Sequence, residues 1–174
     1  MLHGFFLRPA RAVDGADIGH THALAFGRTG EADLVEALAA GPGGVSLVAT
    51  NGAAVVGHVL FSPVTVESPT GNHAALSLAP LGVRPSYQRR GIGAGLVRAG
   101  LAACCALPYR QVFVLGDPRY YARFGFVAAA THGIRCEFPA PSAAFQVLVL
   151  AAGTLPGAGV VRYPPPFHRL EKPG

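Results

Sequence analysis

The sequence predicts a single domain of mixed α/β class. Three observations lead to this class. The chain has 174 residues, 51% of them hydrophobic, which is the size and composition of one globular domain. Segments with helical periodicity alternate with β-rich segments, and a Gly-containing loop joins a strand to a helix near the middle. We expect one domain over residues 1–174, with its core in residues 6–150 and a tail, 151–174, packed on it.

The N-terminal part predicts a strand followed by two helices. Residues 5–8 form a short apolar run before a proline, as a first strand would. Asp14 or Asp17 can cap a helix that runs to about Phe26. A second helix is expected after it, ended by the glycines and the proline of residues 41–44.

The next segment predicts an antiparallel arrangement of strands. Val45–Thr50 and Ala54–Val66 are β-rich and are joined by Asn51-Gly52, a strong hairpin turn. Ala74–Val83 is the following strand. Pro80 lies inside it and cannot donate to a ladder, so we expect a bulge or a splay there.

The C-terminal half predicts one long helix and two further strands. Apolar residues recur every three or four positions from Gly91 to about Leu107. Gln111–Leu115 resembles a buried parallel or central strand. Arg119–Phe124 predicts a short helical turn and Phe145–Leu150 a last strand. The tail segment Tyr163–Phe167 is stiff and aromatic and is expected to pack on the surface of the domain.

The charge of the chain favours an anionic ligand. The formal net charge is +5, which also suits nucleic acid or a membrane surface. No run of like charge stands out, and the sequence has neither a helix-turn-helix signal nor a stripe of aromatic and basic residues. We therefore expect a small anionic ligand, with no nucleic acid and no membrane partner.

Three cysteines, Cys104, Cys105 and Cys136, give neither a disulfide framework nor a zinc-ligand spacing. We expect reduced thiols and no metal. The N-terminus lacks the apolar core of a signal peptide, and no run approaches the roughly 20 apolar residues of a membrane span. A cytoplasmic protein is expected.

The junction after Val83 predicts a phosphate site. A strand ends there and a loop containing Gly91 and Gly93 enters a helix. Such a junction leaves backbone N–H groups without partners, and the helix dipole adds positive potential, so a pyrophosphate fits. Arg89 and Arg90 add charge. A P-loop is excluded because no lysine is present, and the glycine spacing excludes the dinucleotide fingerprint.

The larger pattern resembles the GNAT superfamily of acyl-CoA N-acyltransferases. Its motif Gln/Arg-x-x-Gly-x-Gly/Ala is matched by Gln88-Arg-Arg-Gly-Ile-Gly93, and Val83-x-Pro-x-Tyr87 precedes it. The family's Phe-Tyr-x-x-x-Gly-Phe segment is resembled by Tyr120-Tyr-Ala-Arg-Phe-Gly-Phe126. Its Val-x-Gly strand is resembled by Val56-Gly-His58. The run Val114–Phe126 narrows the resemblance to a bacterial subgroup of predicted N-acetyltransferases.

The resemblance implies a mixed, mostly antiparallel central sheet, flanked by helices and splayed between the strands that end near Val83 and Leu115. It implies acetyl-CoA as cosubstrate, with pantetheine in the splay and the pyrophosphate on backbone amides. The residues that it assigns to coenzyme binding are Leu81, Gly82, Val83, Gln88, Arg89, Arg90, Gly91, Ile92, Gly93 and Ala94.

The resemblance also assigns a catalytic role to Tyr121, which aligns with the family tyrosine near the coenzyme sulfur. A phenol with a pKa near 10 can protonate a thiolate; the alternative is that Tyr121 only packs on pantetheine. Tyr120 is expected to be a core or wall residue. The family often carries a Glu base where this chain has Ala79. The substitutes considered are Glu67, His58, His73 and His132, with a water relay as the default.

The expected function is transfer of an acetyl group from acetyl-CoA to a primary amine by direct attack in a ternary complex. The expected acceptor is a small-molecule or peptide amine. The sequence leaves open whether the chain forms a homodimer. The missing carboxylate motivates an alternative, a non-catalytic acyl-CoA-binding or regulatory module. The segment Gly116-Asp-Pro118 also predicts that the helix carrying Tyr121 is shorter than in the wider family.

Overall fold

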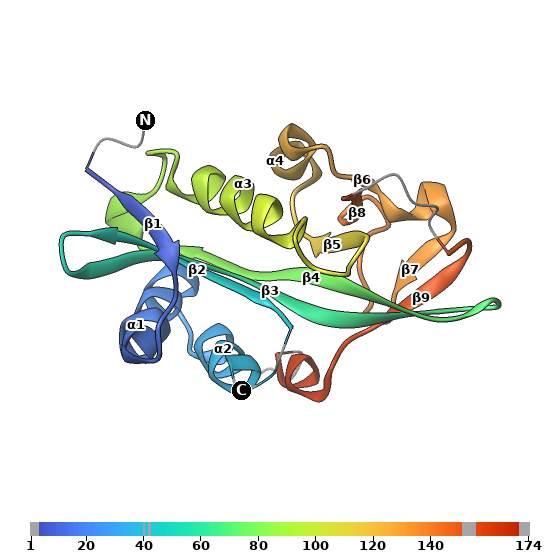
Figure 1. The fold of residues 1–174 in the computed structure, drawn as a ribbon, viewed down its shortest axis with the longest axis horizontal. Coiled ribbons are helices and arrows are strands. Elements are labelled where there is room, and N and C mark those ends of the chain that lie inside the picture. The colour runs from blue at the N-terminus through green and yellow to red at the C-terminus, as the bar shows by residue number, and fades with distance from the viewer. Residues whose placement is uncertain (1–3, 40, 42, 151–155, 171–174) are drawn as a thin grey trace.

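The computed structural model describes residues 4–39, 41, 43–150 and 156–170. These residues form a long, twisted, mostly antiparallel sheet with helices on both faces (Figure 1). The strand order is β1-β2-β3-β4-β5-β8-β6, and β9 pairs with β3 and β7 outside this path. The strands are β1 Phe6–Pro9, β2 Val45–Asn51, β3 Ala54–Ser68, β4 Gly71–Val83, β5 Gln111–Leu115, β6 Val127–Ala128, β7 Ile134–Cys136, β8 Phe145–Val149 and β9 Gly159–Arg162.

The helices divide between the two faces of the sheet. Helices α1 (Gly15–Phe26) and α2 (Gly30–Ala39) cover one face, and α3 (Ile92–Cys104) and α4 (Pro118–Tyr121) lie on the other (Figure 1). Short 3-10 turns complete the fold: η1 Ala12–Asp14, η2 Pro85–Tyr87, η3 Ala122–Phe124, η4 Ala129–His132 and η5 Pro165–Arg169. The mixed α/β class expected from the sequence is confirmed.

Strands β3 and β4 form the long central hairpin, and β4 contains the bulge expected at Pro80. Val59 of β3 lies opposite Leu81, whereas Phe61 lies opposite Leu78. Two steps along β3 therefore match three along β4, which places one extra residue in β4 beside Pro80. The irregularity occurs where the missing N–H of proline makes regular pairing impossible.

The sheet opens between β4 and β5. Among the described residues these parallel strands pair only at Leu76–Val112 and Ser77–Phe113. Beyond these pairs β4 continues to Val83 with β3 on one side, so its other edge separates from β5. The splay expected from the sequence is therefore confirmed.

The hydrophobic core lies on both sides of the central hairpin. On the α3 side, Phe61, Leu96 and Val97 are fully buried in the largest cluster. Gly100 of α3 lies directly over the ring of Phe61, and a Cβ there would overlap that ring. The missing side chain therefore allows α3 to approach the sheet closely and fixes its position.

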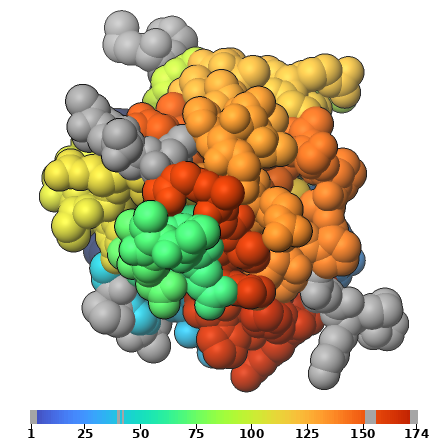
Figure 2. Space-filling view, turned by 90° about the vertical axis from the view of Figure 1, so that its right-hand side faces the viewer, coloured from blue at the N-terminus to red at the C-terminus, as the bar shows by residue number. Residues whose placement is uncertain are grey.

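The tail is more deeply integrated than the sequence suggested. Residues 159–162 form β9, which pairs with Thr65–Glu67 near the far end of β3. Figure 2 shows this green hairpin end beside the orange-red C-terminal segment. Tyr163 and Phe167 are buried, with 8% and 4% of their surfaces exposed, so this segment packs into the core and not only against its surface. Phe145–Leu150 is not the last strand.

These errors have a physical cause. Strands β6, β7 and β9 have two to four residues each, too few to show a period of two. The proline run beside Tyr163 indicates a stiff chain but not what covers it. The expected tail also includes residues 151–155 and 171–174, which lie outside the described residues.

Two negative findings apply to the described residues. No helix there is long and apolar enough to cross a bilayer. No group of three or more His, Cys, Asp or Glu side chains there could hold a metal ion.

Candidate active site

The loop between β4 and α3 is held in an unusual backbone conformation. Gly91 is the residue that precedes the helix, with φ of 81°, and Arg89 has φ of 61°. A left-handed conformation costs a non-glycine residue roughly 1–2 kcal/mol, so the surroundings must enforce it at Arg89. The Gln88 side chain donates to the carbonyl oxygen of Val83 at 2.9 Å and ties the loop to the end of β4.

The start of α3 presents backbone amides to solvent. Gly91 is the N-cap residue and no side-chain hydrogen bond caps α3 there, so the N–H groups of the first turn stay available for an anion. Gln88, Arg89, Arg90 and Gly91 are exposed, whereas the side chain of Ile92 is buried in the core. Ile92 can therefore contact a ligand only through its backbone amide. The Arg90 guanidinium lies 5.4 Å from the centre of the Tyr87 ring.

Gly93, in the first turn of α3, lies against the Tyr120 hydroxyl. A Cβ on it would lie 3.0 Å from the Tyr120 hydroxyl and 3.7 Å from Cγ2 of Val83. The missing side chain therefore leaves room for the Tyr120 hydroxyl beside α3. Ala94 follows in the same first turn and is half-buried.

The end of β4 presents one paired and one open edge. Leu81, Gly82 and Val83 lie opposite Val59, His58 and Gly57 of β3. Their other edge faces the splay. Leu81 and Val83 lie near Gly93 on the α3 side, whereas Gly82 is packed against His22 of α1. An extended ligand could add to this free edge as a further strand.

Two buried histidines, His22 and His58, pack against the end of β4 on the α1 side of the sheet. His22 Nε2 lies 2.8 Å from His58 Nδ1, and His58 Nε2 lies 2.9 Å from the Ser46 hydroxyl. The His22 ring occupies the space that a side chain on Gly82 would need. Burial lowers the pKa of His22 to about 4 and that of His58 to about 3, with their proximity adding to the shift at His58. Both rings are therefore neutral near pH 7.

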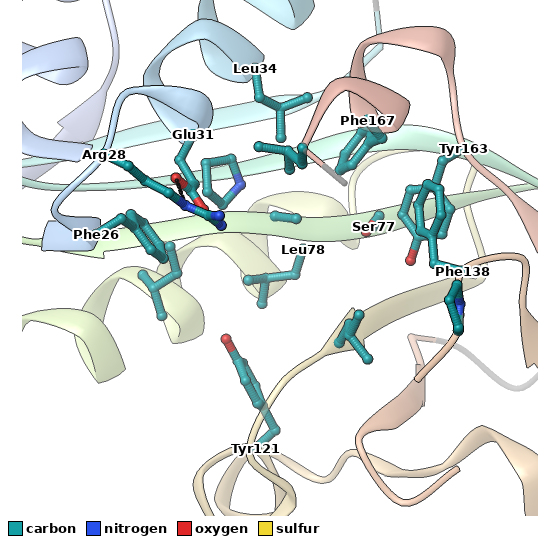
Figure 3. A pocket seen from close by; sticks show the side chains of 16 residues that line it. Phe26, Arg28, Glu31, Leu34, Ser77, Leu78, Tyr121, Phe138, Tyr163 and Phe167 are labelled. Atoms are coloured by element: carbon teal, nitrogen blue, oxygen red, sulfur yellow. Dashed lines mark hydrogen bonds and ion pairs between the residues drawn. The ribbon is translucent and has the colours of Figure 1, made fainter. Parts of the chain in front are cut away.

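A cavity of about 410 Å³ opens at the splay. It lies between the bulged part of β4, the end of β5, the turn between α1 and α2, and η5 (Figure 3). Leu78, Ala79 and Leu81 of β4 and Leu115 of β5 are among the residues that line it. The splay therefore leads into a partly open space of the size of a small-molecule site.

Tyr121 is held at one wall of this cavity with its hydroxyl directed inward (Figure 3). The residue is 9% exposed, and burial, with a contribution from Tyr120, raises its pKa above the usual value. Gly116 makes the position possible, because a Cβ there would lie 2.5 Å from Cε2 of Tyr121. Asp117 caps the short α4 by accepting from the Arg119 amide at 2.9 Å. The short helix expected at this position is confirmed.

The candidate bases considered from the sequence do not reach this cavity. His58 of β3 is buried against His22 of α1, and Glu67 pairs with Arg162 at 2.7 Å near the far end of the hairpin. His73 and His132 are also absent from the described lining of the cavity. Ala79 does line it, so the position where the family often carries a carboxylate is apolar here.

Glu31 is the lining carboxylate that sequence reasoning missed. It lies in the first turn of α2, is 5% exposed, and faces the cavity across from Tyr121 (Figure 3). Arg28 binds it with one contact of 2.5 Å and two of 3.2 Å. An acidic residue in the first turn of a helix normally indicates only a favourable helix dipole, so nothing in the local pattern pointed to the site.

Comparison of the sequence with known proteins gives one family. The model of the acetyltransferase (GNAT) domain matches residues 42–128. YhbS of Escherichia coli strain K12, described as an uncharacterized N-acetyltransferase, is 41% identical over 128 residues, which are 72% of this chain and 75% of YhbS. YjhQ of the same strain, described likewise, is 36% identical over 145 residues, 80% of each chain.

Solved structures show the same architecture. The crystal structure of the GNAT N-acetyltransferase YhbS from Escherichia coli, in complex with CoA, has a TM-score of 0.85 and 35% identity, and covers 94% of this chain and 92% of its own. A GNAT acetyltransferase from Brucella melitensis in complex with acetyl-CoA has a TM-score of 0.78 and 33% identity, covering 95% and 99%.

Proposed function

Because the chain belongs to the GNAT family of N-acetyltransferases, we propose that it transfers an acetyl group from acetyl-CoA to a primary amine by direct attack in a ternary complex. The observation that carries this proposal is the position of Tyr121. Its hydroxyl enters a cavity at the point where the sheet opens, next to the free edge of β4. One space can therefore receive the end of an extended donor and a small acceptor.

The coenzyme is proposed to bind along the junction of β4 and α3. The free backbone edge of Leu81, Gly82 and Val83 suits the amides of pantetheine. The pyrophosphate would be held by the loop and the first turn of α3, residues 88–94. The positive φ angles at Arg89 and Gly91 support this assignment, because they turn the chain so that the helix starts with uncapped amides. Relatives with CoA and acetyl-CoA bound support the choice of donor.

In the proposed reaction the acceptor nitrogen forms a bond to the acetyl carbon, and the carbon–sulfur bond breaks. An ammonium acceptor loses two protons in total: one ends on the coenzyme sulfur and one goes to solvent. Tyr121 donates the proton to sulfur and regains one released from nitrogen. Its raised pKa keeps the hydroxyl protonated at neutral pH, which a donor requires. The described residues hold no histidine in this cavity, so a water relay is proposed for the first deprotonation.

Tyr121→Phe tests the proposed role of the hydroxyl, because the ring stays and only the donor is lost. General acid catalysis typically contributes about 10²- to 10⁴-fold. A thiolate with a pKa near 8.5 already leaves readily, and a buried phenol with a raised pKa matches it poorly. We therefore expect the rate constant for transfer to fall about tenfold to a hundredfold, with unchanged affinity for acetyl-CoA.

Tyr120→Phe is the matched control, since it removes a neighbouring hydroxyl that does not line the cavity. Single-turnover kinetics with one good acceptor should leave this control near the wild-type rate. An unchanged rate in Tyr121→Phe would remove Tyr121 from catalysis and leave it as a wall of the coenzyme groove.

The second candidate function is a non-catalytic acyl-CoA-binding or regulatory module. Ala79 supports it, because the cavity carries no carboxylate at that strand position. Release of coenzyme with a panel of amines separates the two functions. Tight binding of acetyl-CoA without turnover of any amine would favour the module.

A further inference from the structure

The cavity beside Tyr121 has two ends of different chemistry. At one end, Arg28 and Glu31 face the space next to Phe26 (Figure 3). At the other end, Phe138, Tyr163 and Phe167 form an aromatic wall. Tyr121 enters between the two (Figure 3). A molecule that reaches the Tyr121 hydroxyl can therefore meet both a charged group and a flat apolar surface.

The charged end is suited to a cation. Glu31 is the sole carboxylate among the described residues that line the cavity. Its side chain is 7% exposed, whereas that of its partner Arg28 is 61% exposed. Arg28 makes two of its three contacts with Oε1 and one, at 3.2 Å, with Oε2. Because a carboxylate has about four acceptor positions, Oε2 retains capacity for an ammonium group.

The aromatic end is suited to a flat apolar group. The ring centres of Phe138 and Tyr163 are 5.1 Å apart, and those of Tyr163 and Phe167 are 4.8 Å apart, with tilted planes. The three rings form a corner in which a further ring could pack on a face and an edge at once. The η5 turn, which carries Phe167, is held against α2, so the wall belongs to the folded core.

The size of the cavity limits the acceptor. At about 410 Å³ it lies near the small end of the roughly 300–1,000 Å³ found for small-molecule sites, and the acetyl group takes part of it. A polyamine would bring a second ammonium, for which no further carboxylate is present among the described lining residues. One amine on one compact apolar body satisfies both ends.

We propose that the acceptor is a small primary amine carried on an aromatic ring, with its nitrogen at Glu31 and its ring against Phe138, Tyr163 and Phe167. This inference rests on the proposed acetyl transfer and names its substrate class. Glu31 binds the ammonium and orients the nitrogen toward the Tyr121 side of the cavity. Arg28 keeps the carboxylate in place from the solvent side.

The first test measures binding without chemistry. Phenylethylamine is titrated calorimetrically into the protein saturated with CoA, in wild type, Glu31→Gln and the control Glu36→Gln, which removes a carboxylate from an exposed position of the same helix. We expect binding in wild type and in the control, and at least about a tenfold loss of affinity in Glu31→Gln. Equal affinity in all three proteins would overturn the assignment of Glu31.

The second test measures turnover. Phenylethylamine, n-butylamine and spermidine are compared as acceptors in wild type and in Phe138→Ala, whose ring is only half-buried and so tolerates truncation. We expect the largest kcat/KM for phenylethylamine, and about a tenfold rise of its KM in Phe138→Ala with little change for n-butylamine. Preference for spermidine would overturn the inference and leave acetyl transfer intact. Absence of turnover with every amine, despite acetyl-CoA binding, would overturn both.

Discussion

The buried pair of His22 and His58 should make the protein unusually sensitive to mild acid. Either arrangement of protons on the two rings leaves His22 Nδ1 without a partner among the described residues. A proton added at His22 Nδ1 would therefore meet no hydrogen-bond acceptor among the described residues, and only the charge of Glu31 acts to raise the pKa of His22. Lowering the pH from 7 to 5 is the perturbation.

The expected magnitude follows from proton linkage. An unfolded histidine has a pKa near 6.5, whereas the folded pKa is about 4 for His22 and about 3 for His58. Below about pH 6.5 the unfolded chain binds two protons that the folded protein does not. Each proton lowers the free energy of unfolding by about 1.4 kcal/mol per pH unit. The contribution of the two neutral histidines to the free energy of unfolding is thus fully present above about pH 6.5. The free energy of unfolding then falls as the pH is lowered, by roughly 2–4 kcal/mol between pH 7 and pH 5.

Urea unfolding, followed by circular dichroism at pH 7, 6 and 5, measures this loss. The double variant His22→Leu/His58→Leu is the control, because it keeps the positions apolar and removes both titrating groups. Its free energy of unfolding should change much less over the same range. The reasoning is refuted if wild type keeps the same stability at pH 5 as at pH 7, or if the double variant shows the wild-type slope.

Three further predictions concern the coenzyme loop, the helix contact and the N-terminal ion pair. Acetyl-CoA should raise the Tm of wild type and of Gly91→Ala but not of Gly91→Glu. Both variants carry the strain of a positive φ, and only the carboxylate of Gly91→Glu repels the pyrophosphate. Normal binding of acetyl-CoA by Gly91→Glu would mean that the pyrophosphate site lies elsewhere. Gly100→Ala should lower the free energy of urea unfolding by about 1–3 kcal/mol through overlap with Phe61, and an unchanged midpoint would contradict that close approach. Arg8→Met should cost about 1–2 kcal/mol at pH 7, because Arg8 lowers the pKa of Asp14 to about 2; this difference should shrink as pH falls from about 4 toward 2, and a constant difference would count against it.

The sequence alone predicted the elements whose causes are local. The hairpin turn between β2 and β3 forms as predicted but lies at Gly52-Ala53, one residue after Asn51-Gly52, and Gly52 supplies its positive φ of 59°. Pro80 lacks the N–H that regular pairing requires, and the bulge occurs beside it. The strand, loop and helix from Val83 onward were recognisable because the glycines at the start of the helix lie in a short sequence motif, Gln88–Gly93. The family also followed from such runs.

The tertiary structure decided which distant residues share the cavity. Glu31 in the first turn of α2 and Tyr121 after β5 face one space only because the sheet splays and both segments pack at its opening. Phe167 joins them because β9 pairs with the far end of β3 and turns the tail back over the sheet. Local periodicity records which face of an element is apolar, but not which element covers it. That choice depends on packing between segments far apart in the chain, and it determined which side chains line the cavity.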